Sequence, residues 1–128
     1  SEFRISRSGT GNTELSLTDD GDLDVYGDLS IGGTCTGCDA VFQPGYAIES
    51  IEDHAASMWE NSYLPAIGPT NEGRTRISVF EKTTGMINEL EKAHIYIEQL
   101  HDRLQQQEQA IEILTKRLQA HEKADATR

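Results

Sequence analysis

The chain has 128 residues, a formal net charge of −11 and only 6% aromatic residues. Residues 1–81 hold 14 of the 22 acidic side chains and 4 of the 11 basic ones, and this acidity argues against nucleic acid and anionic membranes as partners. No apolar run approaches the roughly 18 residues that a transmembrane helix needs, so membrane insertion is not predicted.

The N-terminal part is predicted to be extended. Residues 1–14 are polar, contain two glycines and predict a flexible segment. From Leu15 onward apolar residues alternate with polar residues or glycine, which is typical of strands, and residues 19–21 (DDG) predict a tight turn. Strands this short do not bury an apolar face within one chain, so residues 15–38 predict a β-strand repeat stalk that intertwines with other copies. The alternating apolar residues are Leu15, Leu17, Leu23, Val25, Leu29 and Ile31.

The two cysteines, Cys35 and Cys38, have the two-residue spacing of redox and zinc motifs. Zinc needs about four ligands, and a redox thiolate is stabilised at a helix N-terminus, whereas these flanks are Gly-rich. A structural disulfide is the preferred interpretation, with free thiols as the alternative. The bridge either closes a small loop within one chain or links Cys35 to Cys38 of a neighbouring chain in a ring of three.

No cofactor and no metal site is predicted. Asp20, Asp22 and Asp24 imitate the first part of a calcium loop, but Val25 and Ile31 stand where that loop needs glycine and glutamate. The solvated side of an alternating strand also explains these acids. The sequence has no recognisable Ser-His-Asp array, phosphate loop or pair of catalytic carboxylates, so the chain is not predicted to be an enzyme.

Residues 39–82 are predicted to form a small head, with a short helix over residues 50–61 and a loop over residues 64–73. Ser50 is suited to cap the helix because Asp53 follows three residues later, as in a capping box. Two prolines together with glycine predict the loop.

Trp59 is the only tryptophan, and it is interpreted as the anchor of the short helix against the strands or the top of the C-terminal helix. The alternative is that Trp59 and Tyr63 bind a ligand such as a sugar.

The C-terminal part is dominated by an apolar repeat of seven residues, written with Leu90 at heptad position a. It predicts a coiled coil over residues 83–122, followed by a tail over residues 123–128. Residues 76–80 predict a strand or an extended lead-in, and the helix is expected to begin between Ser78 and Gly85. The predicted core consists of Met86, Leu90, Ala93, Ile97, Leu100, Leu104, Gln107, Ile111, Leu114 and Leu118.

The charged flanks of this repeat predict how the helices are arranged. Arg103 and Arg117 lie at position g, and Glu108 and Glu122 lie at the following position e. Such pairs meet between chains only when the helices run parallel and in register. The two stretches resemble the Arg-h-x-x-h-Glu signature of parallel trimeric coiled coils, although a polar residue fills the second apolar slot of each. A parallel homotrimer is therefore predicted, with a dimer as the alternative.

Several segments resemble those of bacteriophage tail fibres and related bacterial surface proteins. Residues 27–34 (GDLSIGGT) look like their Gly-x-Leu-x-Val-x-Gly repeats. Residues 39–46 (DAVFQPGY), residues 63–67 (YLPAI) and the helix from Met86 resemble, in the same order, the C-terminal end module of such fibres. The resemblance covers roughly residues 22–104.

The resemblance implies a mixed β and α trimer, with an intertwined β stalk, a small head and a parallel coiled coil. It also implies a place outside the cell, on a cell surface or on a phage-tail-like particle, with the rest of a longer fibre N-terminal to this segment. Related fibre ends cleave themselves with a Ser-Lys dyad, but neither Ser30 nor Ser50 has a lysine close in sequence. The expected function is trimerisation and assembly, the coiled coil setting the register of the stalk; the alternative is a head that binds a receptor or glycan.

Overall fold

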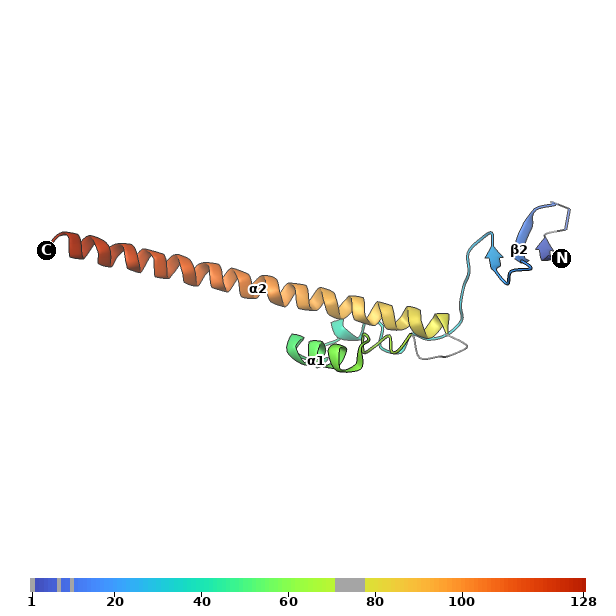
Figure 1. Ribbon diagram of the computed structural model, residues 1–128, viewed down its shortest axis with the longest axis horizontal. Helices are drawn as coiled ribbons and strands as arrows, with labels where there is room; N and C mark the ends of the chain where they lie inside the picture. Colours follow the sequence, from blue (N-terminus) through green and yellow to red (C-terminus); the bar gives the residue numbers. More distant parts are fainter. Residues whose placement is uncertain (1, 7, 10, 71–77) are drawn as a thin grey trace. The chain divides into compact units, whose positions relative to one another are not determined.

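The computed structural model describes residues 2–6, 8–9, 11–70 and 78–128. Within these residues the elements are β1 (Phe3–Ser6), β2 (Thr13–Leu17), β3 (Leu23–Val25), the 3-10 helix η1 (Ala40–Phe42), α1 (Ile51–Asn61) and α2 (Val79–Ala126). The fold is thus mixed, as predicted, with a small antiparallel sheet, a short helix and a long C-terminal helix (Figure 1). The chain divides into two compact units, Ser1–Thr34 and Cys35–Arg128, which are described separately.

The sheet of the first unit has the order β1-β2-β3, and both strand pairs are antiparallel. Residues 18–22 form the turn between β2 and β3. The Thr18 N–H donates to the carbonyl oxygen of Asp22 at 2.9 Å, and Gly21 adopts a φ of 89°, which glycine reaches without steric cost. The predicted strand alternation and the predicted turn are both confirmed here.

The apolar side chains of the three strands share one face of the sheet, because the register aligns them in rows across the strands. Four of the six are exposed, so nothing in the described part of this unit covers that face. On the opposite face the fully buried Ser16 lies between Arg4 and Asp24. The two apolar rows are Phe3, Leu17 and Leu23, and Ile5, Leu15 and Val25.

The structure differs from two predictions for this unit. Residues 1–14 are predicted to be flexible, but β1 lies there and pairs with β2; its alternating sequence FRIS is the signal that reveals it. The predicted stalk over residues 15–38 is a sheet only in part, because Leu29 and Ile31 belong to no strand. An extended segment becomes a strand only where a neighbouring backbone completes its hydrogen bonds, and within this unit's described residues none does so there.

Helix α1 begins where the sequence predicts. The Ser50 hydroxyl accepts a hydrogen bond from the Asp53 N–H at 3.0 Å and donates one to the Asp53 carboxylate at 2.8 Å. The predicted cap by Ser50 is therefore confirmed. The helix ends at Asn61, and Ser62, its C-cap, adopts a left-handed φ of 60°.

Helix α2 begins at Val79, within the stretch from Ser78 to Gly85 where the sequence predicts its start. Ser78 caps it by accepting a hydrogen bond from the Glu81 N–H at 3.2 Å, so Val79 and Phe80 form its first turn and not a strand. Residues 76 and 77 of that predicted strand lie outside the described residues, as do residues 71–73 of the predicted loop. The last residues of the predicted loop that the structure describes are 64–70.

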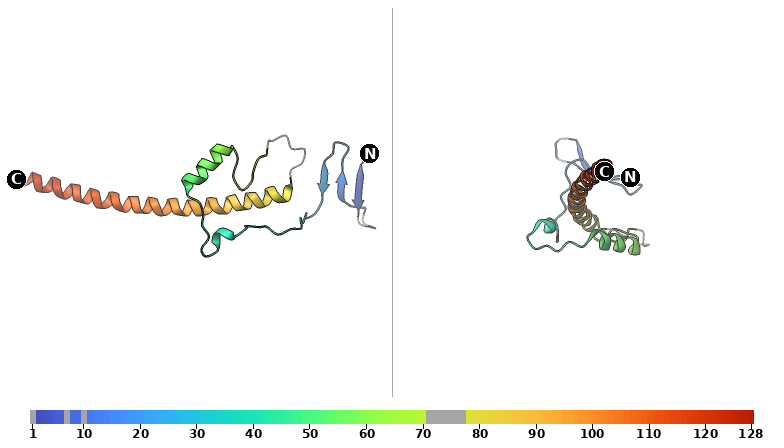
Figure 2. Two further views of the ribbon diagram at one scale, coloured as in Figure 1. Left: turned by 90° about the horizontal axis from the view of Figure 1, so that it is seen from below. Right: turned by 90° about the vertical axis from the view of Figure 1, so that its left-hand side faces the viewer.

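The helix is 48 residues long, or about 70 Å, and it continues through most of the predicted tail over residues 123–128. Figures 1 and 2 show α1 and the preceding segment beside its N-terminal half, while its C-terminal half extends beyond them. No helix in the described ranges combines the length and the apolar character that crossing a membrane requires.

Cys35 and Cys38 form a disulfide within this chain, with their Cα atoms 5.5 Å apart. The structure therefore has the small closed loop and not the interchain ring, which was the other form of the predicted bridge. Gly37 inside the loop has a φ of 96°, a conformation that the tight closure requires.

Candidate functional site

Helix α2 carries a polar stripe that holds the head of its own chain. Its members recur every three or four residues at heptad positions c and g, beside the predicted a and d positions. Glu89, Lys92 and Tyr96 are buried although they are polar. The sequence prediction missed this stripe, and Gly85, a glycine inside the helix, is the signal that could have revealed it. This docking stripe consists of Lys82, Gly85, Glu89, Lys92 and Tyr96.

The N-terminal part of the docking stripe, Lys82 to Glu89, binds the backbone of the loop after α1. The Lys82 ammonium donates to three carbonyl oxygens of this loop, those of Ile67 at 2.7 Å, Pro69 at 2.8 Å and Gly68 at 3.3 Å. The Glu89 carboxylate accepts a hydrogen bond from the Ala66 N–H at 2.6 Å. The two side chains thus satisfy backbone groups that a buried loop would otherwise leave unpaired.

Gly85 allows the loop to approach the helix. A Cβ atom at this position would lie 2.4 Å from the carbonyl oxygen of Ala66, closer than real Cβ contacts come. Glycine inside a helix costs about 1 kcal/mol relative to alanine. Close approach of the loop backbone therefore explains why a helix otherwise free of glycine has one here.

The C-terminal part of the docking stripe, Lys92 and Tyr96, holds the start of α1 through contacts with Glu49. The Glu49 carboxylate lies 2.9 Å from the Lys92 ammonium and 2.8 Å from Nδ1 of His54. The Tyr96 hydroxyl donates to the Glu49 carbonyl oxygen at 3.2 Å, and Nε2 of His54 lies 3.3 Å from the Glu89 carboxylate. The head and α2 are therefore joined by a connected polar network and not by an apolar core.

The electrostatics of this network follow from its contacts. The hydrogen bonds from Lys92 and His54 hold the pKa of the Glu49 carboxyl below its ordinary value. Burial, helped by the charges of Glu49 and Glu89, raises the pKa of Tyr96 to about 12, so its hydroxyl stays protonated and able to donate.

Acid is expected to loosen the head from α2. A carboxyl whose pKa is lower in the folded state stabilises the fold above its unfolded pKa, and that stabilisation is lost as the pH falls through the folded value. At fixed protein concentration, the free energy of unfolding measured with urea should decrease below about pH 4.5, and Glu49→Gln should flatten this decrease. At neutral pH the same substitution should cost about 1 kcal/mol, since the Glu49 side chain is 38% exposed.

Glu60→Gln, which changes an exposed carboxylate on α1, is the control and should keep the wild-type dependence on pH. Equal slopes for wild type and Glu49→Gln in acid would contradict the role given to Glu49.

The disulfide loop docks on α2 next to the docking stripe. The Asp39 N–H donates to both carboxylate oxygens of Glu91, at 2.9 and 3.0 Å, and Gly37 lies against Asn88. Glu91 and Asn88 occupy heptad positions b and f. The head therefore occupies positions b, c, f and g of the helix, which together form one continuous side of it.

The predicted core positions, called the apolar seam, are not covered by any other described part of the chain. Their large apolar side chains are exposed, from 45% for Leu100 to 63% for Ile111. Ala93 and Gln107 of the seam are exposed too. Beyond the head, every residue from His101 to Arg128 is exposed on all sides of the helix; this part is called the open half of α2. An exposed apolar stripe of this length is a candidate interaction surface.

The residues predicted to pair between chains are also exposed. Glu108, Arg117 and Glu122 lie in the open half of α2. Arg103 lies 3.9 Å from the Glu52 carboxylate of its own chain, but both side chains are largely exposed and the contact is long. The predicted pairs with another chain therefore stay predictions.

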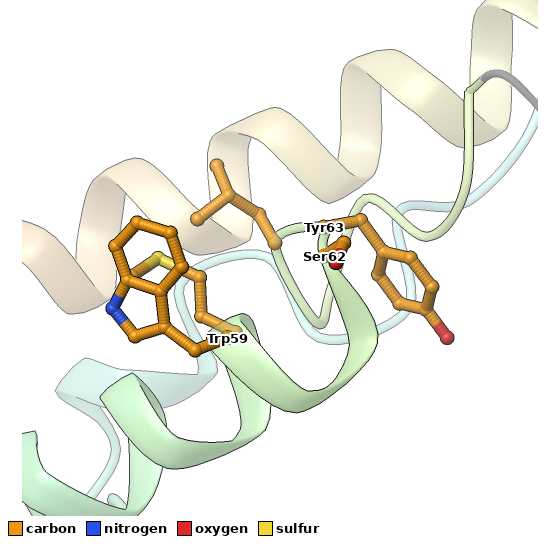
Figure 3. A pocket seen from close by; sticks show the side chains of 5 residues that line it. Trp59, Ser62 and Tyr63 are labelled. Carbon is orange, nitrogen blue, oxygen red and sulfur yellow. The ribbon is translucent and has the colours of Figure 1, made fainter.

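Trp59 is predicted to anchor α1, but within this chain it does not, because its side chain is 77% exposed. His54 and the Ser50 cap are the groups that fix this helix. Trp59 instead lines a shallow apolar pocket at the C-terminal end of α1 (Figure 3). In this view Trp59 and Tyr63 point to different sides of Ser62. The pocket is lined by Met58, Trp59, Ser62, Tyr63 and Leu64.

No protein-family model, curated protein or solved structure matches this chain. The structure brings no group of three or more His, Cys, Asp or Glu side chains together as a metal site within its described ranges. What distinguishes the molecule is the arrangement of α2, with a docked head on one side and the apolar seam on the other.

Proposed function

We propose that this chain is a trimerisation and assembly module at the C-terminal end of a fibre-like protein of a cell surface or phage-tail-like particle. Three α2 helices associate in parallel through the apolar seam, and each carries its head on the outside. One observation supports this above all others: the head uses positions b, c, f and g and leaves positions a and d free. The module needs no catalytic residue and no cofactor.

The energetics of α2 support association. Full burial of a leucine or isoleucine contributes about 1.5–3 kcal/mol relative to exposure. The open half of α2, from His101 onward, has no cover within the described chain, and an isolated helix gains little stability in water. Burial of the seam against other copies supplies what the single chain lacks.

The charged flanks support a parallel arrangement of identical chains. In a parallel coil, position g of one helix faces position e of the next, which brings Arg103 to Glu108 and Arg117 to Glu122 of the neighbour. The choice of three copies over two rests on the resemblance to trimeric fibres and on the Arg-to-Glu signature of parallel trimeric coiled coils.

The first unit supports the same proposal independently. Its sheet has an apolar face that the described part of the unit leaves uncovered, and Leu29 and Ile31 after it are exposed without strand partners. We propose that these surfaces meet their counterparts in the other two chains and form the stalk, with α2 setting their register.

The mass in solution tests this proposal. Light scattering coupled to gel filtration should give about three times the chain mass of 14.2 kDa. Reductant should not change this mass, because the disulfide lies within one chain. A monomer would overturn the proposal, and a dimer would keep the coiled coil but remove the threefold stalk.

Recognition of a receptor or glycan is the second candidate, and the exposure of Trp59 favours it. Binding to a glycan array that Trp59→Ala abolishes without changing the mass would support it. Equal binding by the two proteins would contradict a role for this side chain.

A further inference from the structure

The apolar patch at the end of α1 lies beside the groove between adjacent helices of the proposed trimer. The patch, defined as Met58, Trp59, Tyr63 and Leu64, immediately precedes the loop that Lys82 and Glu89 hold. Those two residues occupy position g. The patch is thereby tied to the g side of α2, at the level of its first turns.

Heptad geometry predicts which residues of the neighbouring helix lie opposite this patch. In a parallel coil the g side of one helix faces the e side of its neighbour at the same level. Position e is the one position flanking the seam that the head's contacts leave free. At the level of the loop it is occupied by Phe80 and Ile87.

The type of residue at position e changes along the helix, from apolar beside the docked loop to polar or charged further along. Phe80 and Ile87 are apolar where the loop docks, and Ile87 is exposed within its own chain. Further along, where no loop docks, the same position is polar or charged in every heptad up to Glu122. These residues are His94, His101, Glu108, Thr115 and Glu122.

We propose that the apolar patch of one protomer packs against Phe80 and Ile87 of the neighbouring protomer. The heads thereby link the three helices around the outside of the coil, in addition to the apolar seam. The contact buries a tryptophan that is 77% exposed in the single chain, and aromatic side chains are common energetic centres of interfaces. This inference rests on the proposed parallel assembly.

Tryptophan fluorescence of the 128-residue chain tests it, because Trp59 is its only tryptophan. In the assembled wild type, acrylamide should quench Trp59 several-fold less than in the seam variant Ile97→Glu/Leu104→Glu. Ile87→Ser should restore easy quenching while the mass by light scattering stays that of the assembly. His101→Ser, at position e beyond the head, should change neither property.

A second measurement keeps the inference testable if Ile87→Ser lowers stability generally. The losses in thermal midpoint from Trp59→Ala and Ile87→Ser should be smaller together than their sum, because the two side chains share one contact. Additive losses would overturn the contact.

The failure of this inference is distinguishable from that of the proposed function. An assembled mass with Trp59 quenched as easily as in the seam variant overturns the patch contact alone. A monomeric wild type overturns the assembly itself. Protection of Trp59 only after a glycan is added overturns the contact in favour of recognition.

Discussion

Replacing Ile97 and Leu104 together by glutamate is expected to convert the assembled protein into a monomer. These residues occupy successive a positions in the middle of the apolar seam, and both are exposed in the single chain. Each substitution removes about 1.5–3 kcal/mol of burial per chain and places like charges together near the axis. Glutamate is a good helix former, so the loss reports on association and not on helix propensity. Gel filtration with light scattering measures the change in mass.

The head should lose its cooperative melting in the same variant. Its docking stripe exists only while the first half of α2 is helical, and a helix without its partners is marginal. Thermal unfolding followed by circular dichroism should therefore broaden and shift to lower temperature. A folded head on a monomeric chain would contradict the idea that association templates the rest of the molecule.

The chain offers a matched control for this experiment. Gln106 and Ile113 lie seven residues apart, as Ile97 and Leu104 do, but at position c of the open half. Gln106→Glu/Ile113→Glu adds the same charge to the same helix outside the seam. It should keep the assembled mass. Loss of assembly in both double variants would mean that charge, and not the seam, is responsible.

Local signals in the sequence were sufficient for the elements whose partners lie nearby. The cap of α1 depends on Ser50 and Asp53, three residues apart, and the turn between β2 and β3 depends on residues 18–22. The long helix follows from its sustained heptads. For these features the pattern and the contact involve the same few residues, so sequence alone predicts them.

The docking stripe could not be predicted in the same way. Lys92 and Tyr96 pair with Glu49, which lies more than 40 positions earlier in the sequence. The head also supplies backbone groups as partners, and a pattern of side chains does not reveal these. Charged residues on a helix ordinarily mark its solvated side, which is why Glu89 and Lys92 gave no signal of burial. Trp59 is the converse case, since a large aromatic side chain suggested burial and lies exposed.

Gly85→Ala is expected to destabilise the protein, although alanine is the better helix former. The substitution gains about 1 kcal/mol of helix propensity. The new methyl group would meet the Ala66 carbonyl oxygen at 2.4 Å, and the loop backbone must move away. Movement of the loop weakens the hydrogen bond from Ala66 to Glu89 and those from Lys82, and charge-assisted bonds contribute about 1.5–3 kcal/mol each. The net loss should be about 1–3 kcal/mol.

Urea unfolding at fixed protein concentration measures this loss, and hydrogen exchange locates it. The Ala66 amide should exchange faster in Gly85→Ala than in wild type, while amides in the open half of α2 should not change. Gln106→Ala, at position c where no loop docks, is the control and should leave the unfolding midpoint unchanged or slightly higher. A higher midpoint for Gly85→Ala would mean that helix propensity outweighs the close approach, and that the loop does not depend on glycine for its place on α2.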